Sequence, residues 1–267
     1  MQIKDSLCVV SGASSGIGRA TARELAKRGA RVILVARRRE RLEEAAREIR
    51  ANGSQAWAYP ADLTRPQAAE GLGKAVLEAH GVPHVLVHGA GAGAWRFIEE
   101  TGYPDFIEMM STPYFSAAFL TRALVPAMLE ENRGFVLSVC SPASRQVWPG
   151  AVGYIAARWA LQGFTEALRA DFYRTNLKAG CFFPSKISDS EYFIQNTHTE
   201  QRIPGVGRLI PAITSHQAAL GIVRAIEREA RIAFEPWQLG AFDLLQKVFP
   251  RISEHLAWSS GAKRERR

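Results

Sequence analysis

The chain has 267 residues, of which 47% are hydrophobic and 22% charged, a composition typical of globular proteins with a sizeable core. Its formal net charge of +8 would favour anionic partners. Part of that charge lies in the basic end 263–267, however, and the arginines of 37–50 alternate with glutamates as on a solvated helix face. Because no basic patch is interleaved with aromatic residues, no nucleic acid is expected as a partner.

Two features of the sequence bear on its compartment. The first apolar run, residues 7–10, is too short for a signal peptide, and no apolar run approaches the roughly 18 residues of a membrane span. The three cysteines, Cys8, Cys140 and Cys181, lie far apart in strand-like runs, which favours reduced thiols over disulfides. We therefore expect a cytoplasmic protein, with peripheral membrane attachment as the alternative.

Short apolar runs of strand type alternate with longer stretches of helical periodicity along most of the chain. The predicted strands are 7–10, 31–36, 55–59, 85–88, 134–140, 177–183 and 231–234, and the predicted helices are 16–28, 39–51, 66–80, 104–131, 152–174 and 215–228. Such alternation is typical of parallel β-α-β crossovers. It predicts an α/β fold, a Rossmann-type doubly wound parallel sheet of about seven strands with helices on both faces, in one domain spanning residues 1–236.

A glycine-rich turn, residues 11–18, links the first strand to the first helix. Glycines let the backbone approach a pyrophosphate closely, and the exposed N–H groups of the helix start favour its charge. The spacing of Gly12, Gly16 and Gly18 resembles the Gly-xxx-Gly-x-Gly turn of the short-chain dehydrogenase/reductase family more than the GxGxxG turn. A plain strand-to-helix turn is the alternative for an isolated match. This resemblance extends over most of the chain, from Leu7 to Phe234, and implies a nicotinamide dinucleotide.

The residues after the second strand bear on the choice of cofactor. An acidic residue there would bind the ribose of NAD, whereas arginine can pair with the 2′-phosphate of NADP. Arg37 and Arg38 therefore predict NADP(H), although arginines that merely open a helix are the alternative. The cofactor-binding residues predicted from the resemblance are Gly12, Ser14, Ser15, Gly16, Ile17, Gly18, Arg37, Arg38, Asp62, Leu63, His88, Gly89, Ala90, Tyr154, Arg158 and Pro184.

A candidate catalytic group follows the fifth strand. Ser141 comes directly after that strand, and Tyr154 and Arg158 lie four residues apart, on one face of the next helix. A tyrosine is a weak acid, and a neighbouring cation favours its ionised form. The resemblance implies that Tyr154 exchanges a proton while hydride passes to or from the nicotinamide, that Ser141 holds the substrate oxygen, and that Arg158 binds the nicotinamide ribose.

Four positions depart from the family pattern. The usual Tyr-xxx-Lys ends in Arg158, which keeps the charge but does not deprotonate, and the family's helix asparagine aligns with Pro113. The usual Asn-Asn-Ala-Gly reads His-Gly-Ala-Gly at 88–91, and the usual Pro-Gly reads Pro-Ser at 184–185. Two hypotheses remain open: an NADP(H)-dependent oxidoreductase acting on a carbonyl/alcohol pair, or a catalytically degenerate member that binds dinucleotide as a sensor or scaffold.

Weaker patterns concern substrate and metal. The aromatic residues Trp95, Trp148, Tyr192 and Phe193 lie in loops after strands, where they either line a pocket for a bulky apolar substrate or pack in the core. His80, His84 and His88 recur at the spacing of helical zinc ligands. Because Gly81 and Pro83 break the helix between them, the side chains should diverge, and no metal site is predicted.

Two segments stand outside the regular alternation. Residues 187–211 mix aromatic and polar side chains with Pro204-Gly205, so they could form a mobile flap. Residues 237–267 read as an amphipathic helix followed by a basic tail. Such a helix packs on its own domain, on a partner subunit or on a membrane surface. We expect a homodimer or homotetramer contact first and peripheral membrane binding second.

Overall fold

The computed structural model describes residues 1–192, 196 and 199–264. Seven parallel strands form one sheet in the order β3-β2-β1-β4-β5-β6-β7. The strands are β1 (Leu7–Ser11), β2 (Arg31–Ala36), β3 (Ala56–Pro60), β4 (Val85–His88), β5 (Gly134–Val139), β6 (Leu177–Pro184) and β7 (Ile232–Glu235). The strand order reverses beside β1, as in Rossmann folds, so the predicted doubly wound sheet is confirmed.

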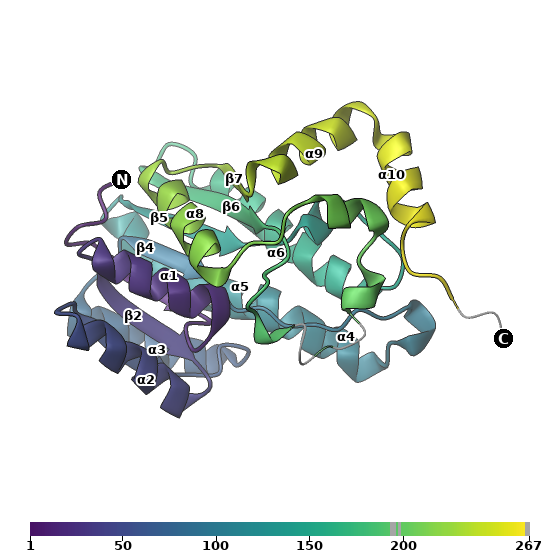
Figure 1. Cartoon of the computed structure of the whole chain (residues 1–267). Helices are drawn as coiled ribbons and strands as arrows, with labels where there is room; N and C mark the ends of the chain where they lie inside the picture. Colours follow the sequence, from purple (N-terminus) through teal and green to yellow (C-terminus); the bar gives the residue numbers. More distant parts are fainter. Residues whose placement is uncertain (193–195, 197–198, 265–267) are drawn as a thin grey trace.

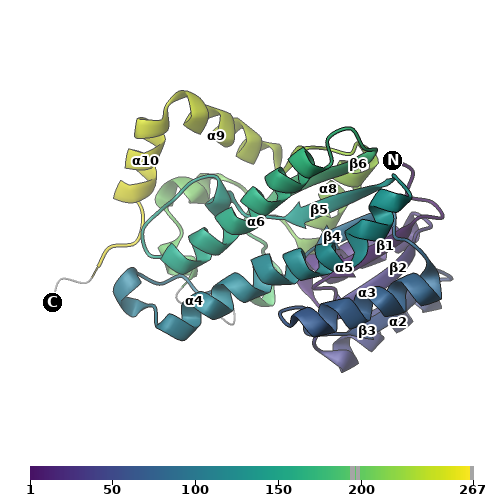
Figure 2. The same ribbon diagram turned by 180° about the vertical axis from the view of Figure 1, so that it is seen from behind.

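Helices cover both faces of this sheet (Figures 1 and 2). One face carries α1 (Gly16–Lys27), α2 (Arg39–Ala51) and α8 (Ser215–Glu227), and the other carries α3 (Pro66–His80), α5 (Ser116–Glu130) and α6 (Val152–Asp171). Successive strand residues point to opposite faces. In β1, Cys8 and Val10 therefore join the core under α1 and α2, while Leu7 and Val9 join the core under α3 and α5.

The long helix predicted over 104–131 is interrupted in the structure. It consists of α4 (Tyr103–Met110), a π-helical turn at Ser111–Phe115, and α5. Proline has no N–H to donate, and its ring clashes with the carbonyl four residues earlier in a regular helix. The buried Pro113 lies in the middle of the π-helical turn, which accounts for the interruption.

The C-terminal segment, predicted as one amphipathic helix, forms two: α9 (Trp237–Val248) and α10 (Pro250–Ser259). Phe249, with φ −125° and ψ 61°, and the following Pro250 make the break. Arg145 anchors α9 with Nε and Nη2 donating to the Asp243 carboxylate at 2.6 and 2.9 Å. Trp258 in α10 donates to the Val147 carbonyl at 3.2 Å. Both anchors lie in the loop that follows β5, so the C-terminal helices pack against that loop.

Two general predictions can be compared with this fold. Across the described residues, no helix combines the length and the apolarity needed to cross a membrane. Cys8, Cys140 and Cys181 are all buried, and none forms a disulfide. Burial raises the pKa of the Cys8 thiol to about 12, so this side chain remains protonated and unreactive.

Candidate active site

A cavity of about 840 Å³ opens at the carboxyl ends of the strands, beside the point where the strand order reverses. Its volume lies within the range of small-molecule sites. The predicted site residues that line it are Gly12, Ser14, Ser15, Gly16, Ile17, Gly18, Arg37, Arg38, Asp62, Leu63, Gly89, Ala90, Ser141, Tyr154, Arg158 and Pro184. Of the predicted set, only His88 is missing from the lining.

The glycine turn after β1 forms a cradle at one end of the cavity. Gly12 adopts φ +70°, and a Cβ on it would lie 2.7 Å from the Gly89 oxygen, so only glycine fits there. Gly16 adopts φ +51°, and no atom lies within 4 Å of where its Cβ would be. At the start of α1, Ser15 makes no side-chain cap and the first turn holds no acidic residue. The backbone N–H groups of the first turn of α1 are therefore left without a side-chain acceptor. Such groups suit a bound anion such as a pyrophosphate.

Basic side chains gather beside this cradle. Arg38 Nη2 donates to Ser15 Oγ at 3.0 Å, while its Nη1 lies 3.8 Å from the Glu191 carboxylate. Arg41 Nη1 lies 2.9 Å from both carboxylate oxygens of Glu191. The Arg41–Glu191 pair was not predicted, because it joins α2 to a segment 150 residues away. Two arginines that already hold a carboxylate have the chemistry to hold a phosphate.

Asp62 lies near this basic group, at the carboxyl end of β3. Thr64 donates to its carboxylate from the hydroxyl at 2.7 Å and from the backbone N–H at 3.2 Å. The Thr64 hydroxyl, helped by the charges of Arg37 and Arg65, lowers the pKa of Asp62. Asp62 is therefore an ionised acceptor at neutral pH, facing the cavity.

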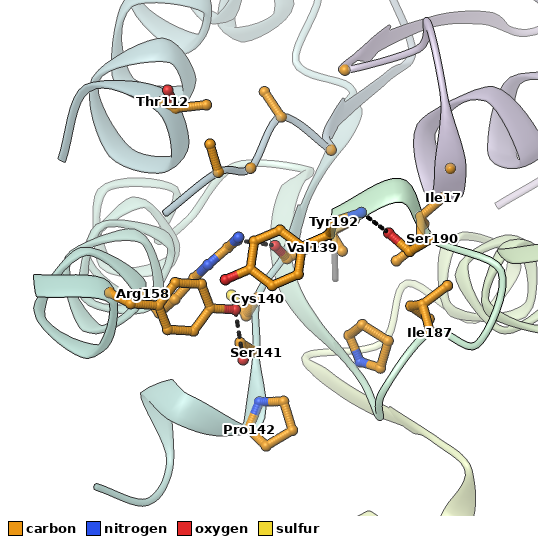
Figure 3. Close-up of a pocket in the computed structure, with 18 of the residues that line it drawn as sticks. Ile17, Thr112, Val139, Cys140, Ser141, Pro142, Arg158, Ile187, Ser190 and Tyr192 are labelled. Carbon is orange, nitrogen blue, oxygen red and sulfur yellow. Dashed lines mark hydrogen bonds between the residues drawn. The ribbon is translucent and has the colours of Figure 1, made fainter. Parts of the chain in front are cut away.

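Ser141 and Arg158, predicted as a catalytic group with Tyr154, lie at the other end of the cavity (Figure 3). Tyr154 lines the cavity beside them. The Tyr154 hydroxyl donates to Ser141 Oγ at 3.3 Å. Ser141 Oγ also accepts from the Ala143 backbone N–H at 3.2 Å, which holds the serine in a short turn after β5. Tyr154 and Arg158 lie one turn apart on α6, and only 7% and 8% of their surfaces are exposed.

The Arg158 guanidinium packs under the Tyr154 ring, with its carbon 5.0 Å from the ring centroid. Arg158 Nη1 is 3.4 Å from the Val139 carbonyl, and Nε has no hydrogen-bond partner among the described residues. A Cβ on Gly91 would lie 2.5 Å from Nη2, so the glycine in the loop after β4 makes room for the guanidinium. A buried cation with an unused donor is thus available beside the phenol.

Aromatic rings form the wall around Tyr154. The Trp95 ring lies 5.6 Å from the Tyr154 ring and 5.2 Å from the Trp148 ring, and Tyr192 lies 6.2 Å from Tyr154. The Tyr192 hydroxyl donates to the Gly93 carbonyl at 2.7 Å. Burial, with a contribution from nearby Tyr154, raises the pKa of Tyr192, so it remains a neutral phenol. Trp95, Trp148 and Tyr192 line the cavity, while Phe193 lies outside the described residues.

Comparison with known proteins agrees with this geometry. A family model of the short chain dehydrogenases matches residues 6–201. The chain belongs to the short-chain dehydrogenase family. A fatty acyl-CoA reductase of Acinetobacter baylyi is 31% identical to this dehydrogenase over 237 residues, which cover 86% of this chain and 76% of the relative.

Two solved structures resemble the dehydrogenase over most of its length. A metagenomic short-chain oxidoreductase in complex with NADP has a TM-score of 0.72 and 27% identity, covering 86% of this chain and 94% of the other. A short-chain dehydrogenase/reductase of Burkholderia phymatum in complex with NAD has a TM-score of 0.83 over 100% of both chains. Since its identity is 19%, the second likeness shows the fold alone.

His88 of the dehydrogenase does not contact the cavity, in contrast to the expectation for a cofactor-loop residue. It is buried, and its Nε2 pairs with Thr121 Oγ1 of α5 at 2.9 Å. Burial lowers its pKa to about 3, so the ring is neutral. His80 and His84 have other partners: His80 pairs with the Tyr59 hydroxyl at 2.8 Å, and His84 accepts from the Leu7 N–H at 3.1 Å.

The π-helical turn and helix α9 are among the parts of the cavity lining that were not predicted from the sequence. The π-helical turn contributes Thr112, followed by Ser116 at the start of α5, while Pro113 is buried and does not line the cavity. Helix α9 also contributes to the lining. Its lining residues are Leu239, Phe242, Asp243 and Gln246. Their spacing of three and four residues is an amphipathic signal, but it does not tell which neighbour that face meets.

Proposed function

We propose that this short-chain dehydrogenase is an NADP(H)-dependent oxidoreductase that interconverts a carbonyl and an alcohol on a bulky apolar substrate. The proposal rests above all on the hydrogen bond from the Tyr154 hydroxyl to Ser141 Oγ, 3.3 Å long and formed at the wall of the cavity. A protein that only binds a nucleotide has no need of two hydroxyls placed to meet one substrate oxygen. We assign the residues at one end of the cavity to the chemical step and those at the other end to cofactor binding.

Tyr154 and Ser141 would act together on the substrate oxygen. In the reducing direction, the Tyr154 hydroxyl gives its proton to the carbonyl oxygen while Ser141 Oγ donates a hydrogen bond to the same oxygen. In the oxidising direction, the phenolate takes that proton back. Arg158, packed against the ring, stabilises the negative charge left on the tyrosine. Bound NADP(H) would supply or accept the hydride.

The residues present fit such a dinucleotide. The uncapped start of α1 and the open space beside Gly16 would receive the pyrophosphate. The Arg158 guanidinium, which lines the cavity, would hold the nicotinamide ribose. Gly89, Ala90 and Pro184 would contact the same cofactor along the lining.

The preference for NADP(H) rests on the basic side chains beside the cradle. Arg37 and Arg38 line the cavity, and no acidic side chain follows β2 directly.

Replacing Arg37 by Ala should weaken NADPH binding about tenfold and leave NADH binding nearly unchanged, since a charge-assisted hydrogen bond is worth about 1.5–3 kcal/mol. Calorimetric titration with both cofactors measures this ratio. An unchanged ratio would remove Arg37 as a phosphate ligand.

The apolar side chains that line the cavity support an apolar substrate. Trp95, Trp148 and Tyr192 present large rings, and the inner face of α9 adds Leu239 and Phe242. The related Acinetobacter baylyi protein is named for its reduction of fatty acyl-CoA, which agrees with a long aliphatic substrate. We therefore propose long-chain aldehydes, ketones or alcohols as the substrate class.

Turnover with a graded panel tests the proposed activity. Purified enzyme is mixed with NADPH and saturated aldehydes or methyl ketones of increasing chain length, and NADPH oxidation is followed for wild type, Tyr154→Phe and Ser141→Ala. The Tyr154→Phe variant should be at least about 100-fold slower in kcat, since removal of a general acid costs about 10²–10⁴-fold. NADPH binding with no turnover in any protein would favour the alternative that Arg158 and Pro113 suggest, a dinucleotide sensor or scaffold.

The oligomeric state and the cellular location of the protein are predictions. A homodimer or homotetramer is expected, and sedimentation velocity of the purified protein measures the state directly. The cytoplasmic location is likewise expected, and fractionation of the source cells tests it.

A further inference from the structure

Helix α9 has two apolar faces with different environments. Its inner face, with Leu239 and Phe242, lines the cavity. Its outer face repeats apolar residues at Trp237, Leu244 and Val248, which are 73%, 63% and 59% exposed. Positions seven and eleven residues apart share one side of an α-helix. The outer face is therefore a continuous apolar stripe with no covering element among the described residues.

Exposed apolar residues also follow in the bend and in α10. Phe249 at the bend, then Ile252 and Leu256, are between 43% and 59% exposed. Figures 1 and 2 both show α9 and α10 as a bent pair at the periphery, at the end of the molecule away from α2. We call Trp237, Leu244, Leu245, Val248, Phe249, Ile252 and Leu256 the outer stripe. Leaving so many large apolar side chains in water is unfavourable, so the outer stripe indicates a contact surface.

The charges beside the outer stripe are mainly positive. Among the described residues from 237 onward, the basic side chains are Lys247, Arg251, Lys263 and Arg264, and the carboxylates are Asp243 and Glu254. Asp243 is buried in its pair with Arg145, and Lys247 lies 2.8 Å from the same carboxylate. Arg264 pairs with Glu99 at 2.6 Å, so Arg251 and Lys263 are the cations of this segment that no ion pair among the described residues offsets. Basic residues that flank an apolar helix face attract anionic lipid headgroups while the apolar residues enter the acyl region.

The shape of the segment favours a lipid surface over a second copy of the chain. A stable protein interface buries about 800 Å² on each partner and needs a complementary surface. Here the exposed apolar residues are spread along two helices that meet at a bend, and the exposed polar residues Lys247, Arg251 and Glu254 lie among them in sequence. A bilayer accommodates such an arrangement without a matching surface, and Trp237 at one end is suited to the headgroup level.

We propose that the outer stripe docks the protein on an anionic membrane, with α9 and α10 lying in the plane of the headgroups. Docking would place the bilayer on one side of α9 and the cavity on the other, so that apolar substrate reaches Tyr154 from the membrane. This second step rests on the proposed function, whereas docking itself does not depend on turnover.

Vesicle flotation tests the docking. Full-length protein is mixed with vesicles of phosphatidylcholine containing 30 mol% phosphatidylglycerol, or of phosphatidylcholine alone, and separated by density. Wild type should float with the anionic vesicles and at least tenfold less with the neutral ones. The fraction of protein that floats with anionic vesicles should be at least tenfold smaller for the double variant Leu244→Glu/Val248→Glu than for wild type. The matched control Tyr173→Glu, which changes an exposed aromatic residue just after α6, should float as wild type does.

Two measurements keep these results interpretable. Unfolding temperature and NADPH affinity of the double variant should match those of wild type, since neither side chain lines the cavity. Equal flotation of wild type and the double variant, or no flotation of wild type, would overturn the proposal. A wild-type dimer that becomes monomeric in the double variant, with no flotation of either, would assign the outer stripe to a second copy instead. Delivery of substrate from the membrane is tested separately. It is rejected if vesicle-bound enzyme reduces long-chain carbonyls no faster than enzyme in detergent.

Discussion

The guanidinium carbon of Arg158 lies 5.0 Å from the centroid of the Tyr154 ring, so the cation packs against the face of the phenol. The family pattern places a lysine at this position, and a lysine has a compact charge on a flexible stem, whereas arginine is planar and wide. Gly91 leaves the space that the wider group needs. The site therefore keeps a fixed cation beside its tyrosine although the residue type differs.

Removing that cation should slow the reaction. We expect Arg158→Ala to lower kcat by about 100-fold or more, because charge developing on the tyrosine loses its neighbour, and Arg158→Lys to stay within about tenfold of wild type. Steady-state kinetics with NADPH and the best carbonyl of the panel measure both. If Arg158→Ala retains the wild-type kcat, Arg158 has no part in proton exchange.

Glu191 should compete with the 2′-phosphate of NADP(H). It binds Arg41 at 2.9 Å and lies 3.8 Å from Arg38, so an incoming phosphate meets arginines already engaged by a carboxylate. Glu191→Gln should tighten NADPH binding about three- to fivefold and leave NADH binding unchanged, since exposed ion pairs are worth about 1 kcal/mol or less. Glu44→Gln, which alters an ion pair between α1 and α2 outside the cavity lining, is the matched control. Weaker NADPH binding in Glu191→Gln would mean that Glu191 assists the cofactor.

Buried His88 should make the fold sensitive to mild acid. Its pKa is lowered to about 3 by burial, while in the unfolded chain it is about 6.5. Below about pH 6.5 the unfolded chain binds a proton that the folded chain does not, so the free energy of unfolding falls by about 1.4 kcal/mol per pH unit down to about pH 3. His88→Asn removes this contribution. Urea unfolding of both proteins at pH 7.5 and pH 5.0 measures their free energies of unfolding. Between these pH values the free energy of unfolding of the variant should rise by about 2 kcal/mol relative to that of wild type. The same difference between the two proteins at both pH values would contradict the lowered pKa of His88.

The Arg145–Asp243 pair should hold α9 against the loop that carries Ser141. Its two hydrogen bonds are 2.6 and 2.9 Å long, and the Asp243 side chain is 9% exposed. Asp243→Asn should lower the free energy of unfolding by about 2–3 kcal/mol, because it leaves the Arg145 charge poorly solvated without its carboxylate. It should also speed proteolysis after Lys247. The control Glu254→Gln removes an exposed carboxylate of α10 and should leave both unchanged.

The sheet was predictable because its strands are buried on both faces, so their sequences are almost uninterrupted apolar runs. The seven predicted runs correspond to β1–β7 within one residue at each end. The interruptions at Pro113 and at Phe249-Pro250 were less legible, since the apolar periodicity continues across both prolines. Proline alone would not have located them, because Pro126 lies inside α5 without ending that helix.

The site could be predicted where it follows the chain locally, as with the glycine turn and the four-residue spacing of Tyr154 and Arg158. The burial of His88 away from the cavity was not predicted, although a signal existed. Strand side chains alternate, so His88 shares a face with Leu86, which packs under α5. The contribution of α9 depends on contacts such as Arg145–Asp243, between residues 98 apart, and no local pattern encodes which face of α9 meets the cavity.

Transfer of deuterium from cofactor to product tests the proposed chemistry most directly. NADPH labelled with deuterium at the transferred position is incubated with a long-chain aldehyde, and the alcohol formed is analysed by mass spectrometry. We predict one deuterium on the carbinol carbon with wild-type protein, and a rate at least about 100-fold lower with Tyr154→Phe. Unlabelled alcohol, or equal rates in the two proteins, would contradict the role assigned to Tyr154.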